Sequence, residues 1–202
     1  MSASAADYHP VKFLDRLEGN KHIVMLYDDE KNADLMIARY FLNGFNGGGS
    51  CVFFTDQDPR AIEKRLATQG IDVERYKSEK RLRIFHTETS DSGKRDVLKT
   101  LRTIRSESTK QMKGPFRFAG RTITDIESVE GLMLGMHLEK IGQEHFEEFD
   151  NSQLCFYDIK RLERTRRDEW VRGLLENHDQ VIYASDPKSA VAFDTSLLEE
   201  ED

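Results

Sequence analysis

The sequence contains little cysteine, with only Cys51 and Cys155 among 202 residues. They lack the paired spacing of a zinc site or a redox pair. Each lies inside an apolar run, "SCVFFTD" and "QLCFYD". A free cysteine in such a run packs as a small hydrophobic side chain. We therefore expect two buried core thiols rather than ligands or nucleophiles.

Long apolar runs and a surplus of positive charge are also missing. No run is long enough to cross a bilayer, and "MSASAADYHP" has neither the basic start nor the apolar core of a secretory signal. The net charge of −7 argues against direct nucleic-acid binding, which depends on clustered Lys and Arg. The basic stretch 160–172 is interleaved with acids, which favours a solvated helix face over a docking surface for an acidic partner. We expect a cytoplasmic protein without membrane or nucleic-acid partners.

Two phosphate-related motifs are incomplete. "GFNGGGS", residues 44–50, has two glycines at P-loop spacing, but it lacks the Lys and leads from a helix into a strand, where glycines serve as a cap and turn. A receiver domain would begin with a run like "MLYDDE", but its phosphoacceptor Asp and its Lys are absent from the later runs. We predict neither a phosphate loop nor a phosphorylation site.

Motifs for metal binding or nucleophilic catalysis are absent as well. His137 and His145 lie two helical turns apart, without an H-E-x-x-H pattern, and no G-x-S-x-G elbow occurs. From local spacing we expect no metal, no cofactor and no catalytic site, and we classify the protein as a non-enzyme.

The features that are present indicate the fold. Six short apolar runs, at 22–27, 50–55, 81–85, 115–119, 153–158 and 180–184, alternate with segments whose apolar residues recur every three or four positions. Parallel strands need helical crossovers and bury both faces. We predict a three-layer, doubly wound α/β fold, a mostly parallel sheet with helices on both faces.

Ligands of open α/β sheets bind beyond the carboxyl ends of the strands. The predicted strand ends carry polar side chains, although such residues also serve as helix caps. They are Tyr27, Asp28, Asp29, Asp56, His86, Thr87, Gly120, Arg121, Tyr157 and Asp158.

The order of these segments resembles the MEDS domain, a sensory domain of methanogen and methylotroph signalling proteins and of a regulator of dichloromethane metabolism. The matching stretches are "HIVMLYDD", "FLNGFNGGGSCVFFTD", "RLRIF", "FRFAG", "LCFYD" and "LLENHDQVI". The resemblance implies a RecA/KaiC-like core without a P-loop. The matching stretches run from about His22 to Tyr183, so we take 21–185 as the domain, 1–20 as an N-terminal extension and 186–202 as an acidic C-terminal tail. From the sequence itself, the first twenty or so residues and the tail segment "SLLEEED" look peripheral.

The resemblance implies site residues by position: His22, Tyr27, Asp28, Gly120, Glu139, Tyr157, Asp158 and His178. Our predicted ligand-binding set takes all of these except His22 and adds the strand-end residues Asp56 and Arg121. Two positions depart from the family pattern, because Arg121 replaces a Glu and Leu138 replaces a Tyr. An Arg at the rim of a site favours an anionic ligand through bidentate pairing.

The resemblance also implies a function. We expect a non-catalytic sensory domain that binds a small organic molecule and signals to a partner, either a transcription regulator or a histidine kinase. The alternatives are a ligand-free interaction module that forms a homo-oligomer and, less favoured, a nucleotide hydrolase with an unorthodox phosphate loop at "DDEKNA".

Overall fold

The computed structural model describes residues 9–87, 97–123, 125–185 and 189–198. Its centre is one sheet with the strand order β3-β2-β4-β5-β1-β6-β7. All pairs are parallel except β6 with β7. The strands are β1 (His22–Tyr27), β2 (Ser50–Thr55), β3 (Leu82–His86), β4 (Phe116–Gly120), β5 (Asn151–Asp158), β6 (Gln180–Ala184) and β7 (Val191–Asp194). The prediction of a doubly wound, mostly parallel sheet is confirmed.

Several of the helices begin where the sequence offers a capping side chain. Asp29, Asp58 and Ser128 accept hydrogen bonds from the first turns of α2, α3 and α6. The helices are α1 (Pro10–Asp15), α2 (Glu30–Asn46), α3 (Pro59–Thr68), α4 (Val73–Ser78), α5 (Val97–Ser108), α6 (Val129–Glu144) and α7 (Arg167–Glu176), with short 3-10 turns η2 (Phe146–Glu148) and η3 (Thr195–Leu198).

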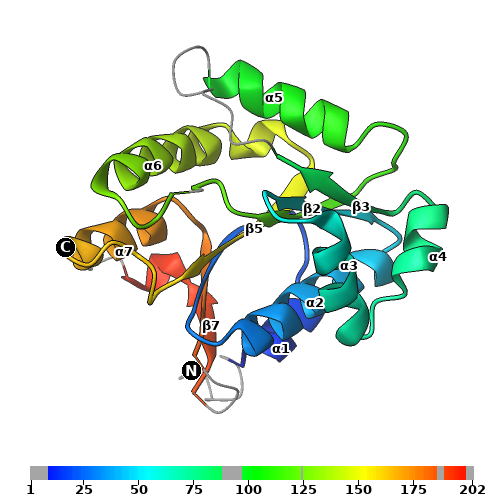
Figure 1. The fold of residues 1–202 in the computed structure, drawn as a ribbon, viewed down its shortest axis with the longest axis horizontal. Coiled ribbons are helices and arrows are strands. Elements are labelled where there is room, and N and C mark those ends of the chain that lie inside the picture. The colour runs from blue at the N-terminus through cyan, green and yellow to red at the C-terminus, as the bar shows by residue number, and fades with distance from the viewer. Residues whose placement is uncertain (1–8, 88–96, 124, 186–188, 199–202) are drawn as a thin grey trace.

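The helices form a layer on each face of the sheet (Figure 1). Side chains of a strand alternate between faces, and β1 shows this clearly. Ile23 and Met25 pack into the core beneath α2, whereas Val24 and Leu26 pack into a second core with α6 and α7. The predicted three-layer arrangement therefore has two separate cores, and the side of β1 that carries Val24 also carries His22.

The glycine-rich segment 44–50 is a tight turn from α2 into β2. Gly47 caps α2, and Gly48 has a φ of +80°, which suits glycine. A Cβ atom on Gly49 would lie 2.3 Å from the carbonyl oxygen of Pro115. The turn packs against the start of β4, as its position between a helix and a strand predicted.

The connection between β1 and α2 is too short for a phosphate loop. β1 ends at Tyr27 and α2 begins at Glu30, so that only Asp28 and Asp29 lie between them. Asp29 uses its carboxylate to cap the helix, accepting a hydrogen bond from Lys31 N at 2.9 Å. This turn therefore presents carboxylates where a P-loop would present backbone amides.

The view of both flanking segments as peripheral needs a correction. Leu14 and Leu17 are buried in the first core, and Arg117 donates to Leu17 O at 3.1 Å and to Asn43 Oδ1 at 2.7 Å. At the other end β7 extends the sheet, where Ala192 is buried beside Ile182. The described parts of both flanking segments therefore contribute to the fold, and the limits of the functional domain stay a prediction.

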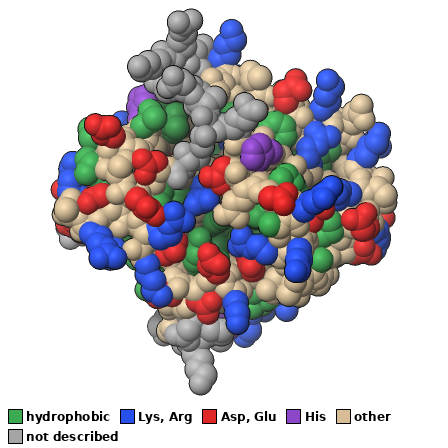
Figure 2. Space-filling model, viewed as in Figure 1, with side chains coloured by type: hydrophobic (Ala, Val, Ile, Leu, Met, Phe, Trp, Pro, Cys, Tyr) green, Lys and Arg blue, Asp and Glu red, His purple; other side chains and the backbone are tan. Residues whose placement is uncertain are grey.

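The surface carries charges of both signs. On the face in Figure 2, basic and acidic side chains are interspersed and neither sign forms a large patch. Within the basic stretch 160–172, Trp170 is buried, and Arg166 pairs with Glu169. No helix in the described part of the chain has the length and apolar composition that a membrane span needs.

Candidate functional site

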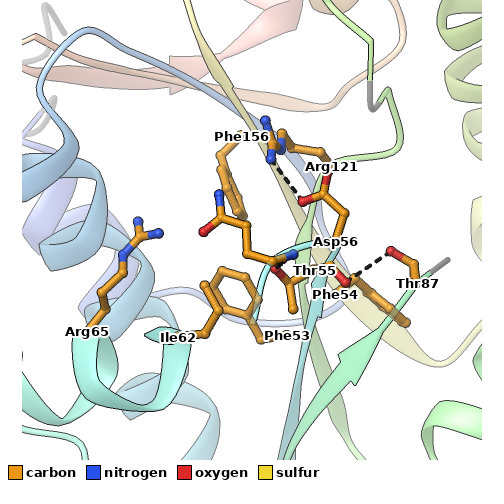
Figure 3. A pocket seen from close by; sticks show the side chains of 10 residues that line it. Phe53, Phe54, Thr55, Asp56, Ile62, Arg65, Thr87, Arg121 and Phe156 are labelled. Atoms are coloured by element: carbon orange, nitrogen blue, oxygen red, sulfur yellow. Dashed lines mark hydrogen bonds and ion pairs between the residues drawn. The ribbon is translucent and has the colours of Figure 1, made fainter. Parts of the chain in front are cut away.

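A cleft opens at the carboxyl ends of β2, β4 and β5 (Figure 3). It is shallow: the enclosed cavity measures about 20 Å³, and the surrounding depression of about 360 Å³ is open to solvent. One wall is apolar and the lip is polar, and the lining residues are Phe53, Phe54, Thr55, Asp56, Gln57, Ile62, Arg65, Thr87, Arg121 and Phe156. This is the position at which doubly wound sheets bind ligands.

Two guanidinium groups border the cleft, and each already has an acidic partner. Arg121 Nη2 lies 3.3 Å from Asp56 Oδ1, in a single contact. The side chain of Arg121 is 18% exposed and that of Asp56 is 33% exposed. Arg65 instead holds Asp34 through its Nε and Nη2 atoms, at 3.1 and 2.5 Å. Arg121 is therefore the less firmly held of the two cations.

Of the other predicted strand-end residues only Thr87 lines the cleft. Tyr27 supports its wall, because the Tyr27 and Phe156 rings lie 6.4 Å apart. Burial raises the pKa of Tyr27, so that its hydroxyl stays protonated. Asp28 approaches Lys160 Nζ at 3.8 Å, and Asp158 accepts a hydrogen bond from Lys160 N at 2.9 Å.

Gly120 has a packing role at the end of β4. A Cβ atom on it would lie 2.7 Å from the Cβ of Phe54, which belongs to the cleft wall. A side chain at this position would push the two strand ends apart. Gly120 therefore allows close backbone packing beneath the site, and direct contact between Gly120 and a ligand stays a prediction.

A second group of predicted residues lies in the interior, on the side of the sheet that α6 covers. Glu139 of α6, Tyr157 of β5, His178 and His22 meet there, together with Cys155. Each is at most 2% exposed. The prediction of one strand-end site that includes Glu139, Tyr157 and His178 is therefore wrong in its geometry. These residues form a separate cluster, which we call the buried tetrad (His22, Glu139, Cys155, His178) with Tyr157 beside it.

The polar atoms of the buried tetrad face one another. Glu139 Oε2 lies 3.9 Å from His22 Nε2, 3.8 Å from His178 Nε2 and 3.9 Å from Cys155 Sγ. Cys155 Sγ lies 3.6 Å from His22 Nε2. The other carboxylate oxygen, Oε1, accepts a hydrogen bond from the Tyr157 hydroxyl, which in turn accepts one from Ile123 N at 3.3 Å.

Burial controls the protonation of this cluster. It raises the pKa of Glu139 to about 7 and lowers that of His22 to about 4. It also lowers the pKa of His178 and raises those of Cys155 and Tyr157. The histidines are therefore neutral near neutral pH, and each neutral imidazole has one nitrogen lone pair available.

A half-buried cation lies at the edge of the cluster. Arg105 of α5 donates to Gln153 Oε1 at 2.8 Å, and Gln153 donates from Nε2 to Cys155 Sγ at 3.1 Å. The guanidinium carbon of Arg105 lies 3.7 Å from the centre of the Phe149 ring. Desolvation lowers the pKa of Arg105 to about 10, which leaves it charged at neutral pH.

Cys155 is the member of the cluster that the sequence interpretation did not include. It is a buried thiol, as predicted, but its neighbours are polar. Its spacing offered one signal, because Cys155 and Tyr157 are two residues apart on a strand and so share a face of the sheet. Cys51 differs, because it donates to Phe41 O at 3.5 Å in the other core.

A family model described as the MEthanogen/methylotroph, DcmR Sensory domain, MEDS, matches residues 21–179. The chain belongs to the MEDS family. All four residues of the buried tetrad and both charged residues of the Arg121–Asp56 pair lie within the matched part of this MEDS domain. No protein of the curated set matches the sequence.

Solved structures show the fold of the MEDS domain in other proteins. The KaiC-like protein PH0186 from the archaeon Pyrococcus horikoshii OT3 superposes with a TM-score of 0.60 and 13% identity, over 88% of this chain and 79% of that one. Another P. horikoshii OT3 protein, from the structural study of project PH0250, superposes with a TM-score of 0.59 and 11% sequence identity, over 91% of each chain. The MEDS domain thus has a KaiC-like fold, as the sequence resemblance implied.

Proposed function

We propose that this MEDS domain is a non-catalytic sensor of a small organic anion, bound in the cleft at Arg121, and that it signals to a protein partner. The observation that carries the proposal is the single contact between Arg121 and Asp56 at the lip of a cleft with an apolar wall. A carboxylate that pairs with both terminal nitrogens of Arg121 would replace this contact with a bidentate one.

The wall of the cleft suggests what the rest of the ligand is like. Phe53, Phe156 and Ile62 supply apolar surface, and Thr87 supplies a hydroxyl near the lip. Because the cavity is small and these side chains are largely buried, the surface suits a short aliphatic body attached to an acidic group. Membership of a sensory-domain family supports binding rather than turnover, and coupling to a regulator or kinase remains part of the proposal.

Replacing Arg121 with alanine is expected to weaken binding of a small organic acid about tenfold or more. A hydrogen bond to a charged group contributes roughly 1.5–3 kcal/mol, and tenfold in affinity corresponds to about 1.4 kcal/mol. The measurement is isothermal titration of a panel of C2 to C8 carboxylic acids, each paired with its uncharged amide.

The matched control is Arg172→Ala, which removes the same charge from an exposed position of α7. We expect this variant to bind as the wild type does. Equal binding of an acid and its amide, or an Arg121→Ala variant with wild-type affinity for every acid that binds, would contradict the proposal. Binding of no member of the panel would favour a ligand-free interaction module.

A further inference from the structure

We propose that the buried tetrad binds one divalent transition-metal ion, with Zn²⁺ as the best chemical match. The four ligand atoms would be His22 Nε2, His178 Nε2, Cys155 Sγ and Glu139 Oε2. They come from β1, the turn before β6, β5 and α6, and they all lie within 4.8 Å of one another. Local spacing in the sequence predicted no metal site, because no two of these residues are sequence neighbours.

The distances between the ligand atoms fit a metal shell better than a hydrogen-bond network. Bonds of about 2.0–2.3 Å in a tetrahedral arrangement place neighbouring ligand atoms roughly 3.3–3.7 Å apart. The contacts of Glu139 Oε2 with the two histidines are 3.8 and 3.9 Å. These contacts are too long for hydrogen bonds, and they reach metal-shell distances with a shift of a few tenths of an ångström.

The outer hydrogen bonds of both histidines leave the inner nitrogens free to coordinate. His22 Nδ1 lies 2.7 Å from Gln143 Oε1, and Gln143 donates from its amide to Asp179 Oδ1 at 2.9 Å. His178 Nδ1 lies 2.6 Å from Leu174 O. A carbonyl can only accept, so each Nδ1 carries the proton and each Nε2 presents a lone pair. This is the arrangement that orients metal-binding histidines.

One of these inner nitrogens is unsatisfied. His178 Nε2 is buried and has no hydrogen-bond partner in the protein. An orphaned buried acceptor costs about 1–3 kcal/mol in general, and its direction toward Glu139 Oε2 and the rest of the tetrad gives it a role as a ligand.

The remaining contacts suit the charged forms of the other two ligands. Tyr157 donates to Glu139 Oε1 and so directs Oε2 inward. Gln153 Nε2 donates to Cys155 Sγ at 3.1 Å, which stabilises a thiolate. One thiolate and one carboxylate neutralise a divalent cation. Binding therefore releases to solvent the thiol proton of Cys155, together with the carboxyl proton wherever Glu139 is protonated.

The donor set determines which ions fit. Two imidazoles, one thiolate and one carboxylate form a mixed N, S and O set, which favours Zn²⁺ and excludes Mg²⁺ and Ca²⁺. Four protein ligands, each at most 2% exposed, leave no open position for substrate. The ion would therefore hold α6 against β1 and β5 rather than catalyse a reaction, and it would be loaded as the chain folds.

The test uses the full chain, unfolded in denaturant with a chelator and then refolded with either Co²⁺ or Zn²⁺. We expect one equivalent of ion per chain by mass spectrometry of metals, and a higher melting temperature than for protein refolded without metal. With Co²⁺ we expect the intense visible bands of tetrahedral coordination and a near-ultraviolet sulfur-to-cobalt charge-transfer band.

Two pairs of variants separate the tetrad from the rest of the chain. Cys155→Ser should abolish the charge-transfer band, and His178→Gln should lower Co²⁺ affinity at least a hundredfold. The controls are Cys51→Ser in the other core and His137→Gln at an exposed position of α6, which should leave the spectrum unchanged.

Two results would overturn the proposal, and neither depends on the folding of a variant. One is wild-type protein that is refolded in the presence of Zn²⁺ or Co²⁺, regains its native circular dichroism spectrum and yet retains less than 0.1 equivalent of the ion per chain. The other is bound Co²⁺ without a charge-transfer band, which would place the ion away from Cys155.

Discussion

Replacing Glu139 with glutamine is expected to raise the free energy of unfolding of the metal-free protein at pH 8 by about 3 kcal/mol. The pKa of this carboxyl rises from 4.5 to about 7 on folding, because the group is buried. One pKa unit corresponds to about 1.4 kcal/mol. Above pH 7 the folded chain must contain an ionised buried carboxylate, whereas a glutamine amide is neutral at every pH.

The sign follows from which state binds the proton more tightly. Between pH 4.5 and 7 the folded state holds a proton that the unfolded state has lost, so the wild type loses stability as the pH rises. The advantage of Glu139→Gln should therefore disappear below pH 4.5. The groups facing residue 139 are the Tyr157 hydroxyl, which can still donate to glutamine, and the side chains of His22, His178, Cys155 and Thr122.

Urea unfolding at pH 8 and pH 4, with chelator present, measures this effect. The control is Glu144→Gln, an exposed carboxylate in the last turn of α6, which should change stability by no more than about 0.5 kcal/mol. The expectation would be contradicted if Glu139→Gln were less stable than the wild type at pH 8. It would also be contradicted if the substitution changed the free energy of unfolding by the same amount at both pH values. The same variant should bind Co²⁺ more weakly, because an amide is a poor ligand.

The second large effect is expected for Gly135→Ala, which should lower the free energy of unfolding by about 2–3 kcal/mol. α6 packs so closely on the segment before it that a Cβ atom at residue 135 would lie 2.3 Å from Ile123 Cγ2 and 2.4 Å from Cγ1. Ile123 is 1% exposed and part of the second core, so it cannot move away. The helix must shift instead, and Glu139 lies one turn further along it.

Gly142→Ala provides a matched control in the same helix. A Cβ atom there meets nothing within 4 Å. Alanine is favoured over glycine inside a helix, and it reduces the freedom of the unfolded chain, so we expect a gain of about 0.5–1 kcal/mol. Thermal or urea unfolding of the two variants should give changes of opposite sign, and changes of the same sign would show that α6 tolerates a shift at residue 135.

The central strands were predictable because each is an uninterrupted apolar run bounded by turn residues. "HIVMLY" and "SCVFFT" coincide with β1 and β2. β7 was not predictable, because "VAFD" is short and begins with an exposed Val191. Its burial comes from pairing with β6, which its sequence does not indicate. The helix α1 was missed for a similar reason, since its six residues are stabilised by contact with α2.

The site was only partly predictable, for a geometric reason. Strand-end reasoning found Arg121 and Asp56, because each follows directly after a strand. It could not show that His22, at the opposite end of β1 from Tyr27, lies beside Cys155 and His178. That proximity depends on the register of β1 with β5 and on how α6 crosses the sheet, which no local pattern encodes.

The strand order also determines when, during synthesis, the protein can complete its interior. β1 leaves the ribosome well before its partners in the sheet, β5 and β6, in which Leu154 and Val181 pair with residues 23 and 24. At translation rates of roughly 5–20 residues per second, β1 waits about 6 to 30 seconds for these partners. Until then its apolar side chains have no strand beside them, and the last ligand of the tetrad, His178, has not been made. The apolar side chains of β1 therefore remain without their sheet partners until β5 and β6 have been made, and all four ligands of a metal ion are present only once residue 178 has been made.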